Sequence, residues 1–195
     1  MLARSRTLSP LRDTILTIGL GLLPACASES AVETTYDPCS PLTIALDPGA
    51  SAAEVSGVEG AVLAWREVLP VQIVLGTGER GADVLPLRFE SGVSYRAMYW
   101  DSIGVISVSR ELLDPADYPV AIAHELGHAF GLLHVDASER PSVMNVGNLA
   151  LGPTADDAAA VRALWGSCGS APAGHQAVRL PTATVAGRSV SSPIK

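Results

Sequence analysis

Hydrophobic residues fall into short runs and helical repeats along the middle of the chain, and this pattern predicts alternating strands and helices. Residues 42–46 and 71–75 are rich in aliphatic and β-branched side chains, and a glycine-containing turn follows each run. Between the two runs, residues 51–69 carry apolar side chains at helical spacing until Pro70 interrupts the pattern. The folded region is therefore predicted to begin with a strand, a helix and a second strand.

Further strands are predicted in the next part of the chain. Residues 84–89 form one of them, and Pro86 favours an edge or irregular strand because proline has no N–H to donate. Residues 94–100 and 103–109 are typical of two short strands joined by a turn at Asp101. An exposed edge of this pair would hold an extended peptide by backbone pairing. An ordinary hairpin without a ligand fits the same residues, and both interpretations stay open.

Two helices are predicted after these strands. Pro119 suits the first turn of a helix that runs to about Gly131. The second helix opens at Thr154 and ends at Gly166, and the acidic residues of its first turn lie where the helix dipole favours negative charge. The first helix has apolar residues to anchor it in a core: Val120, Ala123, Leu126 and Phe130.

The pattern H-E-x-x-H-x-x-G-x-x-H occupies the first of these helices and the turn after it. His124 and His128 are four residues apart, so they lie on one helix face and can reach a single ion. Glu125 can address a water on that ion without being a ligand. Gly131 can take a positive φ and end the helix, which would bring His134 back as the third ligand.

Three protein ligands with one open position are typical of a catalytic zinc site rather than a structural one. A bare H-E-x-x-H occurs by chance in unrelated helices, but the placed glycine and third histidine make chance a poor explanation. Three of the four histidines of the chain lie in this motif, and the fourth, His175, lies near the end. The cofactor predicted is therefore one catalytic Zn²⁺.

Composition is that of a globular protein and narrows the classes of function. The 195 residues are 48% hydrophobic and 17% charged, which suits one domain with a core and some appendages. The formal net charge of −7 leaves no basic surface for nucleic acid, so no nucleic-acid partner is expected.

The beginning of the chain predicts export. Residues 1–26 combine arginines with a short apolar run, which is typical of a signal peptide, and the sequence at its end resembles a lipobox with Cys26 as the lipidated residue. Ordinary cleavage after Ala27 is the alternative. The protein is then either a cell envelope lipoprotein or a secreted protein, with a lipid anchor as its only expected membrane contact.

The rest of the chain divides into three parts. Residues 27–38 are predicted as a tether, 39–169 as the catalytic domain, and 170–195 as a flexible tail rich in small residues and proline. With Cys26 removed or lipidated, Cys39 and Cys168 remain, and a disulfide is the simplest expectation in an oxidising compartment. The alternative is that the thiolate of Cys39 blocks the zinc and keeps the enzyme latent.

The long histidine motif, followed by Ser142-Val143-Met144, resembles the metzincin superfamily of zinc endopeptidases and most of all its matrixin branch, the matrix metalloproteinase-like catalytic domains. The likeness covers about residues 118–166. It implies an α+β fold, a zincin catalytic domain with a twisted mixed sheet and about three helices. It also implies roles for individual residues: zinc ligands His124, His128 and His134, general base Glu125, and turn methionine Met144.

The sequence departs from the matrixin pattern at several places. Val135 follows the third histidine where matrixins favour a small polar residue, and the usual tyrosine or proline does not follow Met144. No second histidine cluster for a structural zinc is present, and no calcium loop is convincing, so calcium is not supported.

The function expected is that of a monomeric zinc endopeptidase that hydrolyses proteins or peptides with a zinc-bound water activated by Glu125. Residues 104–107 are expected to align the substrate strand, and residues 143–146 to shape the pocket beyond the scissile bond. Two alternatives remain: a zinc-containing binding domain, and a toxin-like protease selective for one partner.

Overall fold

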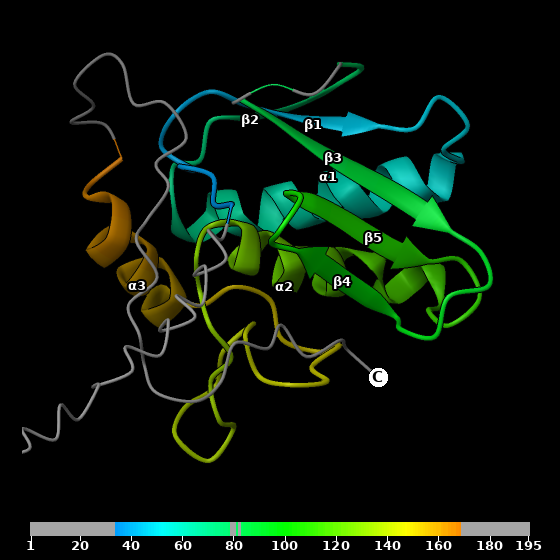
Figure 1. Ribbon diagram of the computed structural model, residues 1–195. Helices are drawn as coiled ribbons and strands as arrows, with labels where there is room; N and C mark the ends of the chain where they lie inside the picture. Colours follow the sequence, from blue (N-terminus) through cyan, green and yellow to red (C-terminus); the bar gives the residue numbers. More distant parts are fainter. Residues whose placement is uncertain (1–33, 79–80, 82, 169–195) are drawn as a thin grey trace, which may run out of the picture.

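The computed structural model describes residues 34–78, 81 and 83–168, which form a mixed sheet covered by helices (Figure 1). In these ranges the chain has a five-stranded sheet and three α-helices, so the predicted α+β class is confirmed. The predicted signal peptide, the lipidation site Cys26 and the tail with His175 lie outside the described residues. No helix within the described ranges combines the length and apolar character needed to cross a membrane.

The sheet has the strand order β2-β1-β3-β5-β4. Strands β2, β1, β3 and β5 are parallel neighbours, and β4 is antiparallel to β5. The hairpin predicted from the sequence is this β4–β5 pair, and β4 forms one edge of the sheet. The strands are β1 (Leu42–Leu46), β2 (Ile73–Gly76), β3 (Val84–Glu90), β4 (Ala97–Trp100) and β5 (Val105–Ser109).

The prediction that Pro86 marks an edge or irregular strand is wrong, because β3 lies in the middle of the sheet. Pro86 is the register partner of Ala45 on β1, whereas the pairing of β3 with β5 begins only at Leu87. Pro86 therefore sits where β3 has a partner strand on one side alone. A missing N–H is tolerated at such a point even in a central strand.

Helices α1 (Ala52–Val68) and α2 (Tyr118–Ala129) lie side by side against one face of the sheet, and α3 (Ala155–Trp165) lies apart from the strands (Figure 1). A short 3₁₀ helix, η1 (Pro115–Asp117), leads into α2. Ser51 and Glu54 form a capping box at the start of α1. The indole of Trp65, fully buried, donates to the carbonyl of Ala123 at 2.9 Å, so the core of α1 directly fixes the backbone of α2.

A disulfide joins Cys39, before β1, to Cys168, after α3. The two cysteines are 129 residues apart in the sequence, so the bond closes almost the whole folded region into one covalent loop. Cross-links of this kind act mainly on the unfolded chain, whose freedom they reduce more as the loop grows longer.

Replacing both cysteines by serine should therefore destabilise the protein without changing its fold. The chain-entropy model gives a loss of about 5 kcal/mol for a loop of this length. Urea unfolding followed by circular dichroism measures this loss, and unreduced and reduced wild-type protein serve as the controls. A double-serine variant with the midpoint of the unreduced wild type would contradict the expectation.

Candidate metal centre

Helix α2 carries three of the motif residues into the interior. His124, Glu125 and His128 are all buried, and the rings of the two histidines meet edge to face with centroids 4.9 Å apart. Side chains four residues apart on a helix face the same way, and both imidazoles therefore emerge on one side of α2.

The turn after α2 has the geometry of a Schellman motif. Gly131 has a φ of 92°, its N–H donates to the carbonyl of His128 at 2.8 Å, and the N–H of Leu132 donates to the carbonyl of Gly127 at 2.9 Å. A residue with a side chain rarely takes this conformation, and glycine takes it readily. The turn reverses the chain and brings His134 back over the helix.

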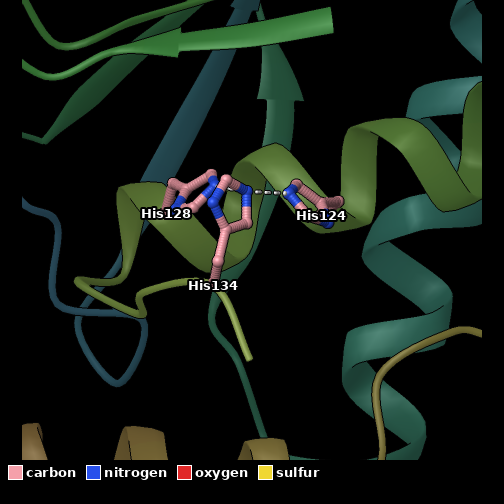
Figure 2. Close-up of side chains that lie close together, drawn as sticks. All are labelled: His124, His128 and His134. Carbon is pink, nitrogen blue, oxygen red and sulfur yellow. Dashed lines mark hydrogen bonds between the residues drawn. The ribbon is translucent and has the colours of Figure 1, made fainter. Parts of the chain in front are cut away.

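The three histidines converge through their Nε2 atoms (Figure 2). The Nε2 of His134 lies 3.1 Å from that of His124 and 3.1 Å from that of His128. The Nδ1 atoms of the helical pair face carbonyl oxygens, that of His124 toward Val143 at 2.7 Å and that of His128 toward Leu132 at 2.8 Å. A carbonyl only accepts hydrogen bonds, so each Nδ1 carries the proton and each Nε2 of the pair carries a lone pair.

This arrangement fits a zinc ion. Burial lowers the pKa of His124 to about 4 and that of His128 to about 3, so both rings are neutral near pH 7. Neutral lone pairs that point at one another repel unless a cation lies between them. Zn–N bonds of about 2.0–2.1 Å in tetrahedral geometry place the nitrogens about 3.3 Å apart, close to the spacing here. No other group of histidine, cysteine or acidic side chains in the described part of the chain has metal-site spacing.

Glu125 lies beside this point without joining the ligand group. Its Oε2 accepts a hydrogen bond from the backbone N–H of Tyr99 on β4 at 2.6 Å. Burial raises the pKa of Glu125 to about 8, against the opposing effect of that hydrogen bond. A divalent cation nearby would favour the ionised carboxylate.

Met144 lies beneath the ligands and is buried. Its Sδ contacts the place where a side chain at Gly127 would begin, so the helix is able to approach the turn only because residue 127 is glycine. Gly127 stands between the two helical ligands in the motif. The resemblance implies that Met144 is a turn methionine, and in the structure its side chain lies against Gly127 of α2.

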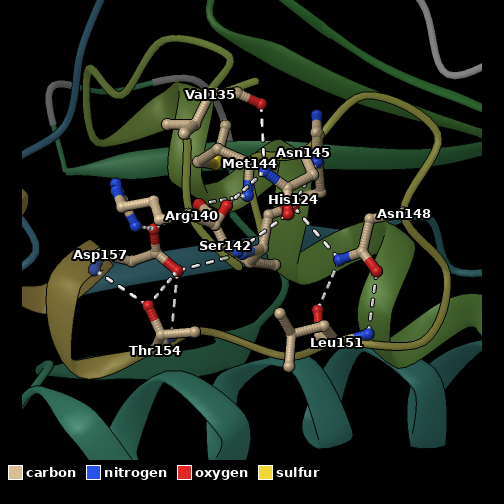
Figure 3. A network of polar contacts seen from close by, with 11 residues as sticks. His124, Val135, Arg140, Ser142, Met144, Asn145, Asn148, Leu151, Thr154 and Asp157 are labelled. Carbon is tan, nitrogen blue, oxygen red and sulfur yellow. Dashed lines mark hydrogen bonds and ion pairs between the residues drawn. The ribbon is translucent and has the colours of Figure 1, made fainter. Parts of the chain in front are cut away.

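A buried carboxylate holds the same turn from the other side (Figure 3). Asp157, the third residue of α3, is fully buried. Its Oδ1 accepts from the hydroxyl of Ser142 at 2.5 Å and from Arg140 at 3.0 Å, and its Oδ2 accepts from the N–H of Val143 at 3.0 Å and of Thr154 at 2.9 Å. Arg140 supplies the opposite charge.

The sequence pattern around Asp157 indicates the start of a helix and gives no sign of a role at the site. The residue that Asp157 holds, Val143, is the one whose carbonyl orients His124. Burial alone would raise the pKa of Asp157, but the hydrogen bonds from Ser142, Thr154, Val143 and Arg140 outweigh it and lower the pKa. The carboxylate therefore stays ionised inside the protein.

Other residues expected at the site are placed differently. Within residues 104–107, expected to align a substrate strand, Ile106 and Ser107 are paired with β3 on one side and β4 on the other, so their backbone cannot also pair with a substrate. The edge strand on this side of the sheet, among the described residues, is β4. Within residues 143–146, Val143 is buried and Val146 is 65% exposed, so only the end of this stretch reaches the surface. Cys39 is bonded to Cys168, which contradicts its alternative role as a latency thiolate on the metal.

Comparison with known proteins finds likeness at the level of structure. No protein-family model matches the chain, and no curated protein matches it. The structure of myroilysin aligns with a TM-score of 0.38 and 18% identity, over 52% of this chain and 52% of that one, so the chain spans about half of its length. High choriolytic enzyme 1, a hatching enzyme zinc-protease from Oryzias latipes (medaka fish), aligns with a TM-score of 0.46 and 17% identity, over 73% of this chain and 98% of that one. Both TM-scores lie below 0.5, so the assignment of a function rests on the geometry of the site.

The role of Asp157 predicts how stability depends on pH. Its folded pKa is lowered, so its stabilising contribution is complete above the unfolded value of about 3.9 and is lost as the pH falls toward the folded value. Asp157→Asn should cost about 3 kcal/mol at pH 7, as expected for removing one partner of a buried ion pair. The difference from wild type should shrink as the pH falls below about 4.

Urea unfolding between pH 7 and pH 3 measures this difference. Asp156→Asn is the matched control. Asp156 is exposed in the same helix turn, and its substitution removes the same formal charge. The idea is lost if the two variants have equal free energies of unfolding across the range.

Proposed function

We propose that the chain is an exported zinc endopeptidase of the metzincin type, with a matrixin-like site, that hydrolyses peptide bonds in proteins. One observation carries the proposal. Three histidine Nε2 atoms converge on one point, and Glu125, which is buried, directly follows the first of these histidines on α2. A structural zinc site needs a fourth protein ligand and no base, whereas a hydrolytic site needs an open position and a base.

The ion would be held by the three histidines His124, His128 and His134. When bound, zinc supplies Lewis acidity, which makes water more acidic and polarises a substrate carbonyl. The two helical ligands are fixed through their Nδ1 protons by Val143 and Leu132, so their lone pairs are held in place before any ion arrives. Such fixed geometry limits the reorganisation that binding requires.

Glu125 is the proposed general base and acid. The N–H of Tyr99 holds Oε2, which fixes the plane of the carboxylate, and Oε1 is the atom we assign to proton transfer. It accepts a proton from the attacking water and later gives it to the leaving amine. Because this carboxylate is buried, a proton on it is not lost to bulk solvent between the two steps.

The edge of β4 is the proposed place for the substrate. Among the described residues, the strand that pairs with β4 is β5, and the carbonyls of Arg96 and Trp100 point to that side, where they accept from the N–H groups of Ser109 and Gly104. Backbone groups alternate along an antiparallel strand, so Ala97 and Tyr99 direct theirs away from β5. The N–H of Tyr99 does so, and it reaches Glu125. A peptide added as a further strand would pass beside the base.

Export is supported by the disulfide between Cys39 and Cys168, since such bonds persist in oxidising compartments. We assign residues 1–26 as the signal peptide and Cys26 as the lipidation site of a cell envelope lipoprotein, with cleavage after Ala27 as the alternative. The mass of the mature N-terminus distinguishes the two.

Glu125→Gln should abolish hydrolysis while zinc binding persists, because the amide keeps the size of the side chain but accepts no proton. General acid–base catalysis contributes about 10²–10⁴-fold, so kcat should fall by at least about 100-fold. Cleavage of an unfolded protein by the mature protein, with zinc content measured by atomic absorption, tests this. Glu59→Gln, an exposed carboxylate on α1, is the matched control.

Removal of zinc with a chelator should stop the reaction, and added zinc should restore it. Equal activity of Glu125→Gln and wild type would refute the role of the base. Zinc bound in equal amount with no hydrolysis of any unfolded protein would contradict a general endopeptidase and favour a binding domain or a selective protease.

A further inference from the structure

The three proposed ligands are not held equally. His124 and His128 stand on α2, and each donates its Nδ1 proton to a backbone carbonyl. His134 stands on a loop, and within the described part of the chain no hydrogen bond reaches its Nδ1. Metal-binding histidines almost always have such a partner, which sets the orientation of the ring. For the third ligand, the contacts that the described residues show are those of the backbone beside it.

The backbone just after His134 is hydrogen-bonded to the turn that contains Met144. The N–H of Val135 donates to the carbonyl of Met144 at 3.1 Å, and Val135 and Asn145 form an isolated parallel bridge. The side chain of Asn145 then donates to the carbonyl of Val135 at 3.0 Å. Both backbone polar groups of Val135 are thereby held, one by the turn backbone and one by a side chain (Figure 3).

The amide of Asn145 uses the rest of its capacity on the same loop. Its Nδ2 also donates to the carbonyl of Arg140 at 3.1 Å, and its Oδ1 accepts from the N–H of Ser142 at 2.9 Å. Both amide protons and the oxygen are therefore engaged with main-chain atoms of the loop. The hydrogen bonds of Asn145 therefore hold the two ends of the loop 135–145 together, and His134 directly precedes this loop.

We propose that Asn145 is the positioning residue of His134, acting through Val135; this inference rests on the zinc site proposed above. It fixes the backbone next to this ligand, whereas the two helical ligands are fixed through their Nδ1 protons. A ligand on an unheld loop must be ordered when the ion binds, and the entropy lost then weakens binding. The sequence departs from the matrixin pattern at this very residue, where asparagine follows Met144.

Zinc affinity tests the proposal directly. Asn145→Ala should raise the zinc dissociation constant about 10-fold or more, the lower end of the range for loss of outer partners of a metal site. Asn145→Leu, which keeps the bulk of the side chain and removes its hydrogen bonds, should do the same. Competition with a chromophoric chelator measures the constant on protein shown to be folded by circular dichroism.

A double-mutant cycle separates positioning from a general structural role. In a His134→Ala background, Asn145→Ala should have no further effect on zinc affinity, because the ligand it positions is gone. The visible spectrum of the cobalt-substituted Asn145→Ala protein should move toward that of His134→Ala. Asp136→Ala is the control: its carboxylate holds only the exposed turn at Ser138 in the same loop, and affinity should stay within about 2-fold of wild type.

The outcomes distinguish this inference from the proposed function. If His134→Ala weakens zinc binding but Asn145→Ala and Asn145→Leu do not, the positioning role is refuted and the zinc site stands. If Asn145→Ala weakens binding equally with and without His134, it acts through another ligand and the proposal is refuted. If wild type and His134→Ala bind zinc alike, the three-histidine site itself fails, and this inference fails with it.

Discussion

The hydrogen bond between the Nδ1 of His124 and the carbonyl of Val143 is the contact on which the candidate metal centre depends. It joins α2 to the turn that contains Met144, and it fixes which nitrogen of the ring has a lone pair. Asp157 from α3 accepts a hydrogen bond from this turn at Val143, and Met144 of the same turn packs against Gly127 of α2. Elements far apart in sequence therefore set the direction of one lone pair.

Asp157 and Glu125 are both buried carboxylates, but their surroundings give them opposite pKa shifts. Asp157 accepts hydrogen bonds from several donors and an arginine, its pKa is lowered, and it serves as a permanent anchor. Glu125 accepts a hydrogen bond from the backbone N–H of Tyr99, and burial raises its pKa. A group held near the balance between its two protonation states can exchange protons, whereas a fully satisfied anion cannot.

Features set by local geometry were predictable from the sequence, and features set by distant contacts were not. The spacing of His124 and His128 follows from the helix repeat, and the turn at Gly131 from the conformational freedom of glycine. The prediction from Pro86 was wrong because a proline is tolerated in β3 only where β5 has not yet begun to pair. The start of that pairing is not visible in the local sequence. Likewise the capping position of Asp157 was visible, but its second task toward Val143 depends on how α3 packs against the turn.

The disulfide has a consequence for the peptidase activity that we propose. Every residue between Cys39 and Cys168, including the exposed stretch after His134, lies inside a single covalent ring. One backbone break anywhere in that ring leaves a connected molecule, because the two pieces stay joined through sulfur. A nick made by the proposed activity, or by another protease, would change the pattern of the protein on a reducing gel before any part of the fold was released.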